Sequence, residues 1–361
     1  MGLVQGNSGK ASDVRDDSLP DNQLTEQGDN VARALILGIN GQDGSYLAEI
    51  LLSKGYEVHG LIRRTATGNL RNIEHIQDKI HLHYGDLTEP ISLHRVIAEV
   101  GPREIYNEAD QDHAGVSFQI PGYNFDVTGS AVGRILEIIR QVDKSIRFFQ
   151  PVTSNMFGQA TECPQNEATG FNPVNPYSCA KVFAYYVSHM YRKAYDMHVS
   201  LAIFYNHESP RRTEHYVTRK ITRSVARIKA GLQDELVLGD VSAMIDWGYA
   251  REYMETAWQI VQLDRPDTFV IGTGEVHSVK DFVKEAFGSV GLDYARYVKS
   301  SSDFLRPAQN SVLQADVSKA RRVFGFDPKV KYKELVKIMM DHDLKDVARG
   351  SSGVSIALQH A

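Results

Sequence analysis

The segment Ala32-Arg33-Ala34-Leu35-Ile36-Leu37-Gly38-Ile39-Asn40-Gly41-Gln42-Asp43-Gly44 decides the fold of this chain. Its first six residues form an apolar run of buried-strand length that ends at a glycine. A Gly-x-x-Gly-x-x-Gly spacing follows, and a helical pattern of apolar residues starts at Tyr46. Glycines at a turn from a strand into a helix let the backbone approach a pyrophosphate, whose charge the helix N-terminus stabilises. The segment therefore predicts a dinucleotide-binding strand, turn and helix.

Apolar runs of strand length recur downstream and alternate with helical stretches. This alternation predicts a parallel sheet covered on both faces by helices, the Rossmann-type doubly wound α/β class. After about Asn206 the pattern predicts loops and shorter elements, which end in a helix near Tyr332 to Val347. The expected strands are 32–37, 56–62, 80–84, 104–106, 146–149 and 200–204.

These patterns predict four parts of the chain. Residues 1–31 are polar and have no periodic apolar face, so we expect a disordered N-terminal tail. We expect the Rossmann domain over 32–205 and a smaller substrate-binding lobe over 206–350, with some segments of the lobe returning to the first domain. Residues 351–361 are expected to form a flexible tail.

Composition argues against several classes of protein. A chain of 361 residues with a formal charge of −5 gives no reason to expect nucleic-acid binding, and no apolar run approaches a membrane span. Cys163 and Cys179 fit no metal spacing and favour a reduced, cytoplasmic setting. The 13 histidines form no metal spacing either, and His81 and His83 alternate along an expected strand, so no metal site is predicted.

Two segments after the expected strands bear on the cofactor. Arg63-Arg64 ends the second strand, where an acidic residue would hydrogen-bond the ribose 2′-hydroxyl of NAD. Arginine there suits the 2′-phosphate of NADP instead, although two solvated surface arginines are the alternative. Asp86-Leu87 follows the third strand, where it can meet the adenine. The sequence therefore predicts NADP.

Tyr177 and Lys181 lie four residues apart and so share one face of a helix. A phenol has a reference pKa of about 10, too high for a base at neutral pH. A neighbouring ammonium and a nicotinamide cation lower that pKa, so Tyr177 can take a proton from a sugar hydroxyl while hydride leaves to the cofactor. The pair follows a strand that ends at Thr153-Ser154, which strengthens the prediction of hydride chemistry.

Basic residues gather in Arg211-Arg212, Arg219-Lys220 and Arg223. A solvated basic face is one interpretation. Contacts of Arg212 and Lys220 to a nucleotide diphosphate are the interpretation that we favour, because a phosphate-binding lobe is expected nearby.

Aromatic residues follow Tyr177 along the same expected helix. We expect them to form core and dimer interface, because such helix faces are buried when subunits associate. They are Phe183, Tyr185, Tyr186 and Tyr191.

Longer motifs extend through most of the chain. They are Gly38–Leu47, Gly55–Gly60, His83–Leu87, Asn206–Arg212, Val217–Ile221, Asp246–Gly248 and Thr273–Val279. On these motifs, the chain from Ala34 to about Ala348 resembles the extended short-chain dehydrogenase/reductases and, within them, the GDP-mannose 4,6-dehydratase family. The run Asn206-His-Glu-Ser-Pro-Arg-Arg212 is the most specific of them.

The resemblance implies a cytoplasmic NADP-dependent lyase that converts GDP-mannose to GDP-4-keto-6-deoxy-mannose, a step toward GDP-fucose and other deoxysugars. Members of the family oxidise the C4 hydroxyl, lose water across C5–C6 and return the hydride to C6. A homodimer or homotetramer is implied as well. The catalytic residues that the resemblance implies are Thr153, Tyr177 and Lys181, with Asn155 at the position of a family glutamate.

The resemblance also implies two sets of binding residues. For the cofactor they are Gly38, Asn40, Gly41, Gln42, Asp43, Gly44, Arg63, Arg64, Asp86, Leu87, Ala109, Gln111, Tyr123, Lys181, His207 and Arg212. For the GDP-sugar they are Ser154, Asn206, Lys220, Arg306 and Gln309.

The chain departs from the family pattern at the site. The family glutamate that removes the C5 proton is replaced by Asn155, and an amide cannot supply general-base catalysis, which typically contributes about 10²- to 10⁴-fold. Ile245 replaces a phosphate-binding arginine, and Gln309 replaces a ribose-binding glutamate. The segment beside the nicotinamide is Glu108-Ala-Asp110-Gln-Asp112 where the family has Leu-Ala-Ala-Gln-Ser.

These departures leave three functions open. The first is a GDP-mannose 4,6-dehydratase, in which Asp112 replaces the missing base if its carboxylate comes within about 3 Å of C5. The second is a nucleotide-sugar C4 oxidoreductase or epimerase without dehydration. The third is a non-catalytic cofactor-binding scaffold, against which the retained Tyr177 and Lys181 argue.

Overall fold

The structure is a computed structural model that describes residues 2, 31–66, 68–301, 308 and 310–351. The chain divides into Met1–Val31 and a compact unit, Ala32–Ala361, and the second unit is described below. The two expected tails lie almost wholly outside the described residues, and Arg306 and Gln309 lie outside them too.

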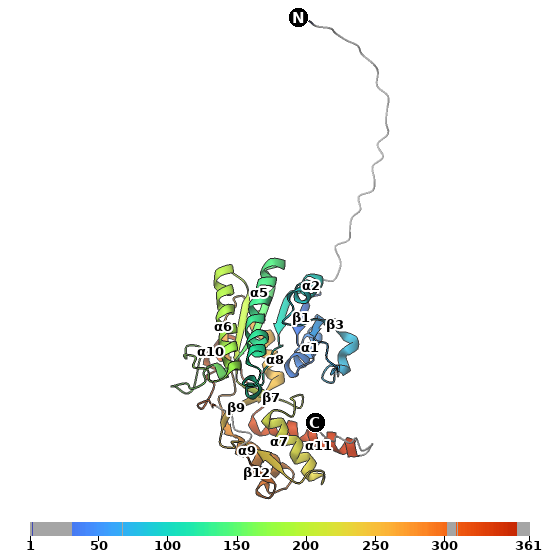
Figure 1. Cartoon of the computed structure of the whole chain (residues 1–361), viewed down its shortest axis with the longest axis vertical. Coiled ribbons are helices and arrows are strands. Elements are labelled where there is room, and N and C mark those ends of the chain that lie inside the picture. Colours follow the sequence, from blue (N-terminus) through green and yellow to red (C-terminus); the bar gives the residue numbers. More distant parts are fainter. Residues whose placement is uncertain (1, 3–30, 67, 302–307, 309, 352–361) are drawn as a thin grey trace. The chain divides into compact units, whose positions relative to one another are not determined.

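A seven-stranded sheet in the order β10-β6-β5-β4-β1-β2-β3 forms the centre of this unit (Figure 1). All of its strand pairs are parallel, which confirms the predicted doubly wound α/β class. Six of the strands are the predicted ones, whereas β10 was not predicted. The strands are β1 (Arg33–Leu37), β2 (Glu57–Ile62), β3 (His81–Tyr84), β4 (Glu104–Asn107), β5 (Arg147–Thr153), β6 (Val199–Phe204) and β10 (Thr268–Ile271).

The helices around this sheet form two groups, in which α2, α5 and α6 pack together and α1 packs against α8 (Figure 1). They are amphipathic: α5, for example, buries Ile135, Leu136 and Ile139 at helical spacing. The long helices are α1 (Gln42–Ser53), α2 (Pro90–Val100), α5 (Ala131–Val142), α6 (Pro176–Tyr195) and α8 (Ala250–Gln262). Shorter ones are η1 (Glu74–Lys79), α3 (Ala114–Ser117), α4 (Pro121–Asn124), η2 (Phe125–Ser130), η3 (Ser154–Met156) and α10 (Ser318–Phe324), whereas η4 (Tyr294–Arg296) packs against α9 (Val279–Ser289) of a second apolar cluster.

A second apolar cluster, separate from the core of the large sheet, is built by α7, α9 and α11. These helices are α7 (Val217–Lys229), α9 (Val279–Ser289) and α11 (Tyr332–Ser351). Two small sheets accompany them, β11-β9-β7 and β12-β8. Their strands are β7 (Asn206–Glu208), β8 (Leu236–Leu238), β9 (Met244–Tyr249), β11 (Val276–Ser278) and β12 (Val298–Ser300).

The expectation of loops and short elements after about Asn206 was wrong for α7, α8 and α9, which have 13, 13 and 11 residues. Helix α7 shows the reason. It buries Ile221, Val225 and Ile228 at helical spacing, but basic and hydroxyl residues between them dilute the apolar pattern. Over the described residues, none of the helices combines the length and apolarity that crossing a membrane requires.

Because the strands of the large sheet are parallel, their carboxyl ends meet at one edge. The turn after β1, the loop after β4 and the segment after β5 therefore come together there. Ligands of open α/β sheets bind at this edge, so it is the place to look for the site.

Candidate functional site

The turn from β1 into α1 is shaped to hold a phosphate group. Gly38 has φ 81°, and a Cβ at this residue would lie 2.9 Å from the Cβ of Ala109. A Cβ at Gly44 would lie 2.4 Å from the carbonyl oxygen of Gly38, so only glycine lets the helix come this close. The N–H groups at the start of α1 face the turn, which is the arrangement that binds a pyrophosphate.

The start of α1 is anchored to β7 and the residue after it. Gln42 donates from Nε2 to the carbonyl of His207 (3.2 Å) and accepts from the hydroxyl of Ser209 (2.8 Å). Asp43 Oδ2 lies 3.0 Å from His207 Nε2. Burial alone would raise the pKa of Asp43, but the charge and hydrogen bond of His207 hold it below its usual value. The predicted cofactor residues Gln42, Asp43 and His207 therefore form one cluster.

The arginine predicted to recognise the 2′-phosphate has a partner across the site. Arg63, just after β2, donates from Nη1 to the hydroxyl of Tyr123 in α4. Both side chains were predicted to contact the cofactor, and both are exposed, as is Arg64. Oδ1 of Asp86 accepts hydrogen bonds from the backbone N–H (2.9 Å) and the hydroxyl (2.8 Å) of Thr88, so these contacts stay within its own loop.

Other predicted cofactor residues hold the loops at this edge. The side chain of Asn40 donates to the carbonyl of Asn69 (3.0 Å), and the carbonyl of Leu87 accepts from Nη2 of Arg134 (3.0 Å). The backbone N–H of Gln111 donates to a threonine hydroxyl in η2 (3.2 Å). These contacts keep the loops after β1, β3 and β4 beside one another.

Thr153, Tyr177 and Lys181 are all buried and meet at the carboxyl end of β5. The hydroxyl of Tyr177, in the first turn of α6, shares a hydrogen bond with Thr153. Lys181, one turn further along α6, donates to the carbonyl of Pro151 (2.9 Å). It also lies 2.6 Å from Oδ2 of Asp110, which comes from the loop after β4. The structure therefore assembles the predicted triad and adds a carboxylate to it.

That carboxylate changes the electrostatics of Tyr177. Burial, followed by the charges of Asp110 and Asp112, raises the pKa of Tyr177 well above its usual value. Nζ of Lys181 lies 5.8 Å from the centre of the Tyr177 ring and is held by Asp110. Among the side chains of the protein alone, Lys181 is paired with Asp110, so a Tyr177 pKa lowered by the lysine and the nicotinamide cation stays a prediction.

Asn155 is directed at Thr153 and at a second asparagine. Its backbone N–H (3.2 Å) and its side-chain Nδ2 (3.1 Å) donate to Oγ1 of Thr153. Its Oδ1 accepts from Nδ2 of Asn310 (2.5 Å). The side chain of Asn155 therefore orients the hydroxyl of Thr153. It is an amide, so this position has no carboxylate.

Asp112, the expected substitute base, is already paired. Its Oδ2 lies 3.0 Å from Nη1 of Arg212, and its carboxylate also hydrogen-bonds Tyr216. Arg212 lies 3.4 Å above the Tyr216 ring and 3.6 Å from Oε2 of Glu208. Asp112 and Glu208 therefore share the guanidinium that was predicted to contact the cofactor.

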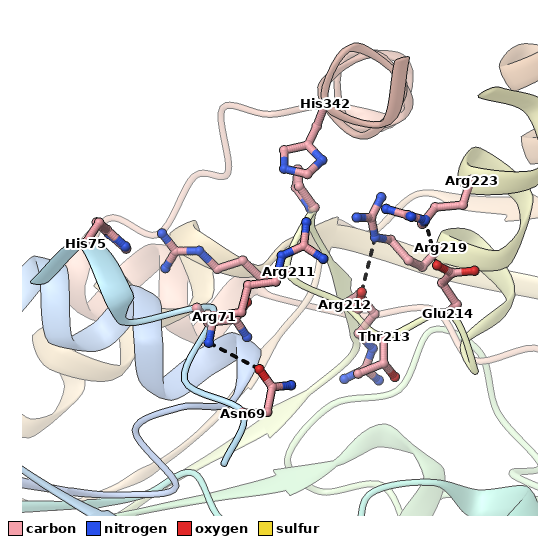
Figure 2. A pocket seen from close by; sticks show the side chains of 12 residues that line it. Asn69, Arg71, His75, Arg211, Arg212, Thr213, Glu214, Arg219, Arg223 and His342 are labelled. Atoms are coloured by element: carbon pink, nitrogen blue, oxygen red, sulfur yellow. Dashed lines mark hydrogen bonds and ion pairs between the residues drawn. The ribbon is translucent and has the colours of Figure 1, made fainter. Parts of the chain in front are cut away.

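The arginines in and before α7 form a network of ion pairs. This differs from the solvated basic face that was one of the two interpretations of the sequence. These arginines line a cavity of about 300 Å³ shared by the segment after β2, the loop before α7 and α11 (Figure 2). Arg223 lies 2.6 Å from Glu214 and 3.1 Å from Asp346. Other pairs are Arg219 with Asp343, Arg71 with Asp346 and Arg211 with Glu49.

The predicted sugar-nucleotide residues are spread over several elements. Ser154 is buried after β5, and Asn206 is exposed at the start of β7. Lys220 is half-buried in α7, and burial lowers its pKa. Ile245, at the position of the family arginine, packs against the second apolar cluster.

Sequence reasoning missed one contact of the triad and one contact of Asn155. Asp110 was noted as a departure, but its contact to Lys181 was not foreseen. A signal existed, because β4 and β5 are neighbours and the residues after them must share an edge. Asn310, which contacts Asn155, lies in no motif and gave no signal.

Comparisons with known proteins agree with the fold and show the family of this chain. A family model described as GDP-mannose 4,6 dehydratase matches residues 35–339. The chain is similar to GDP-mannose 4,6 dehydratase 2 of Arabidopsis thaliana, with 46% identity over 86% of this chain and 87% of that one. The similarity to GDP-mannose 4,6 dehydratase of Drosophila melanogaster is 44% (86% and 86% covered), and to that of Homo sapiens 41% (86% and 91%).

Solved structures show the same fold at lower identity. The dTDP-glucose 4,6-dehydratase of Bacillus anthracis in complex with NAD has a TM-score of 0.77 and 20% identity, over 88% of this chain and 98% of that one. RMD of Pseudomonas aeruginosa complexed with NADPH has a TM-score of 0.74 and 18% identity, over 88% and 100%. Both of these structures share the fold of this chain and hold a nicotinamide nucleotide.

Proposed function

This chain belongs to the GDP-mannose 4,6-dehydratase family, and from that premise we propose that it oxidises the C4 hydroxyl of a GDP-hexose, GDP-mannose first, with a nicotinamide cofactor. One observation carries the proposal. Thr153, Tyr177 and Lys181 come together, buried, at the carboxyl edge of a Rossmann sheet and next to the glycine turn after β1.

The residues at this edge fit a dinucleotide. The turn at Gly38 and Gly44 has no room for a side chain, and the N-terminus of α1 offers backbone N–H groups to a pyrophosphate. Arg63 and Tyr123 approach each other across the expected adenine end. A guanidinium at this place favours a 2′-phosphate, so we propose NADP rather than NAD. A bound nicotinamide supplies the acceptor for the C4 hydride.

The protein side chains handle the proton. Thr153 orients the substrate hydroxyl, and the oxygen of Tyr177 receives its proton, because these two hydroxyl groups are already hydrogen-bonded to each other. Lys181 follows Tyr177 by one turn of α6, and its ammonium is paired with the carboxylate of Asp110. Oxidation is therefore expected to be slow at neutral pH and to accelerate as the pH rises.

Loss of water needs a second base, for the proton on C5. The amide of Asn155 cannot act as one, and Asp112 is held by Arg212 and Tyr216. We therefore propose that any dehydration is slower than C4 oxidation. The contacts of Asn155 favour a second candidate function, a C4 oxidoreductase or epimerase that releases its product without loss of water.

Mass analysis of the products separates these functions. Purified protein is incubated with GDP-mannose and NADP, and the mass of the sugar nucleotide is then measured by mass spectrometry. Loss of water supports a dehydratase, and loss of two hydrogens supports the oxidoreductase. An unchanged mass with a changed configuration at C4, read by proton NMR, supports the epimerase. A sugar nucleotide unchanged in both mass and NMR spectrum, with the cofactor bound, would refute the proposed activity and leave a cofactor-binding scaffold.

We also propose a homodimer or homotetramer assembled through α6. Phe183, Tyr186 and Met190 expose 52%, 60% and 45% of their surface, and their spacing puts them on one face of that helix. Large apolar side chains grouped in this way are typical of subunit interfaces. Light scattering should give a multiple of the chain mass, and Tyr186→Glu should give the monomer. A monomeric unaltered protein would contradict the proposal.

A further inference from the structure

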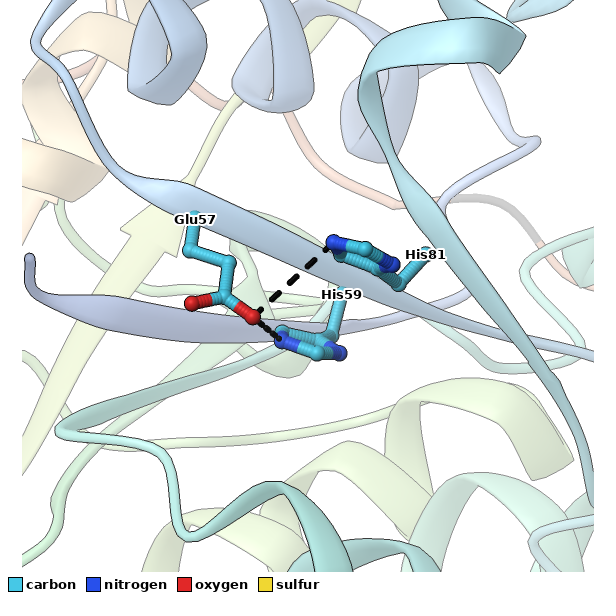
Figure 3. Close-up of side chains that lie close together, drawn as sticks. All are labelled: Glu57, His59 and His81. Carbon is cyan, nitrogen blue, oxygen red and sulfur yellow. Dashed lines mark hydrogen bonds and ion pairs between the residues drawn. The ribbon is translucent and has the colours of Figure 1, made fainter.

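Three histidines and a glutamate meet where β2 pairs with β3, at the edge of the large sheet. In the strand register His59 is opposite His81, and Leu61 is opposite His83. Glu57 lies two residues before His59, and side chains two apart on a strand share one face of the sheet. Figure 3 shows the carboxylate of Glu57 beside the rings of His59 and His81, which stack on each other with their centres 4.8 Å apart.

The spacing of the ligand atoms suits one metal ion. Oε1 of Glu57 lies 3.0 Å from Nε2 of His59 and 3.9 Å from Nε2 of His81. One ligand atom from each of the three residues lies within 4.8 Å of the other two. Around a tetrahedral Zn²⁺ with ligands at about 2.0–2.2 Å, neighbouring ligand atoms lie about 3.3 Å apart. To close the site, the exposed His81 ring has to turn out of its stack on the His59 ring and direct Nε2 at the ion.

His83 supplies the support that metal-bound histidines need. Its Nε2 lies 3.0 Å from Nδ1 of His59, on the side of the ring away from Glu57. Metal-ligating histidines almost always donate their second ring N–H to a neighbour, which fixes the tautomer. Here His59 can donate from Nδ1 to His83, and an ion then replaces the proton between His59 Nε2 and Glu57.

A second group of possible ligands differs in its charge partners. His342, Asp343 and Asp346 also lie close together, but the two carboxylates are paired with arginines of α7. A cation would have to displace those arginines. Within the described part of the chain, the ion pairs of Glu57 are to His59 and His81.

We propose that Glu57, His59 and His81 bind one divalent transition-metal ion of the zinc class, with water as the fourth ligand. The site goes beyond the proposed function, because it lies in the first half of β2, whereas the cofactor edge follows the end of that strand. His59 and Arg63 are four residues apart, which is about 13 Å along a strand. The ion would join the edge strand β3 to β2 and so stabilise the fold without touching the hydride site.

Metal titration of the full chain, without a histidine tag, tests the site. We expect one Co²⁺ per chain with visible absorption typical of four- or five-coordinate cobalt, displacement by Zn²⁺, and a higher unfolding temperature with Zn²⁺. His81→Ala should lower the affinity by at least about tenfold, and His83→Ala by about 10- to 100-fold. Glu57→Gln keeps the size of the side chain and should also weaken binding.

His94→Ala is the matched control, because His94 is exposed on α2 and outside the cluster. It should bind Co²⁺ like the unaltered protein. Circular dichroism shows whether each variant is folded. The proposal is overturned if the unaltered protein does not bind Co²⁺ or Zn²⁺ in tenfold excess. It is also overturned if folded His81→Ala and Glu57→Gln bind as well as the control. Neither readout depends on enzymatic activity.

Discussion

Replacing Asp110 should accelerate the oxidation step, since its carboxylate neutralises the catalytic lysine. Asp110→Asn keeps the size of the side chain and removes its charge, so the ammonium of Lys181 is no longer paired at 2.6 Å. The freed charge then acts on the phenolate of Tyr177. Cofactor affinity of the variant is measured separately, because Asp110 contacts Lys181, which is one of the predicted cofactor residues.

The distance in the structure sets the size of this effect. Nζ of Lys181 lies 5.8 Å from the centre of the Tyr177 ring. At an effective dielectric constant of about 20, a unit charge at that distance is worth 332/(20 × 5.8), about 3 kcal/mol. This corresponds to a rate increase of about 100-fold below the pKa of Tyr177, as an upper limit. The remaining carboxylate of Asp112 acts in the opposite direction and reduces the gain.

Single-turnover formation of NADPH from GDP-mannose, followed between pH 6 and 10, measures this step. The rate profile of Asp110→Asn should move to lower pH, and Tyr177→Phe in the same background should abolish the signal. Asp196→Asn is the control, because Asp196 is exposed at the end of α6, where asparagine tolerates φ 54° equally well. If Asp110→Asn gave the same pH profile as this control, the role assigned to the Asp110 contact would be wrong.

Three further variants address the base, the cofactor and the stability. Asn155→Glu should accelerate loss of water by about 10²- to 10⁴-fold. The readout is exchange of the C5 hydrogen in deuterated solvent, and rapid exchange in the unaltered protein would show that another base acts. Arg63→Glu should reverse a preference for NADP over NAD, since one lost charged contact costs about 1.5–3 kcal/mol. Equal affinities of the unaltered protein for NADP and NAD would contradict the role of Arg63. Burial alone would lower the pKa of His207, but the charge of Asp43 and the hydrogen bonds to Asp43 and to the carbonyl of Tyr205 together raise it. Its stabilising contribution is therefore present below pH 6.5 and is lost as the pH rises through the folded value. Urea unfolding should therefore show stability falling over that interval, and His207→Gln should remove the slope; an unchanged slope would exclude His207 as its origin.

The large sheet was predictable because its strands are buried on both faces. Such strands are short, continuous apolar runs, and six of them were found at nearly their true bounds. The seventh, β10, has only four residues, and it returns to the sheet after the elements of the second apolar cluster. Helix α7 was missed because tertiary packing, rather than its own apolar pattern, stabilises a helix so rich in basic residues.

By itself, the sequence determined the local features of this protein: the glycine turn after β1, and the shared helix face of Tyr177 and Lys181. Both follow from backbone geometry over a few residues, and the structure has both. Only the tertiary structure decided that Asp110 contacts Lys181 and that one carboxylate oxygen of Glu57 faces both His59 and His81. Charge interactions and metal ligation depend on distances of a few ångströms between segments, and these distances come from strand register and loop path rather than from the spacing of residues along the chain.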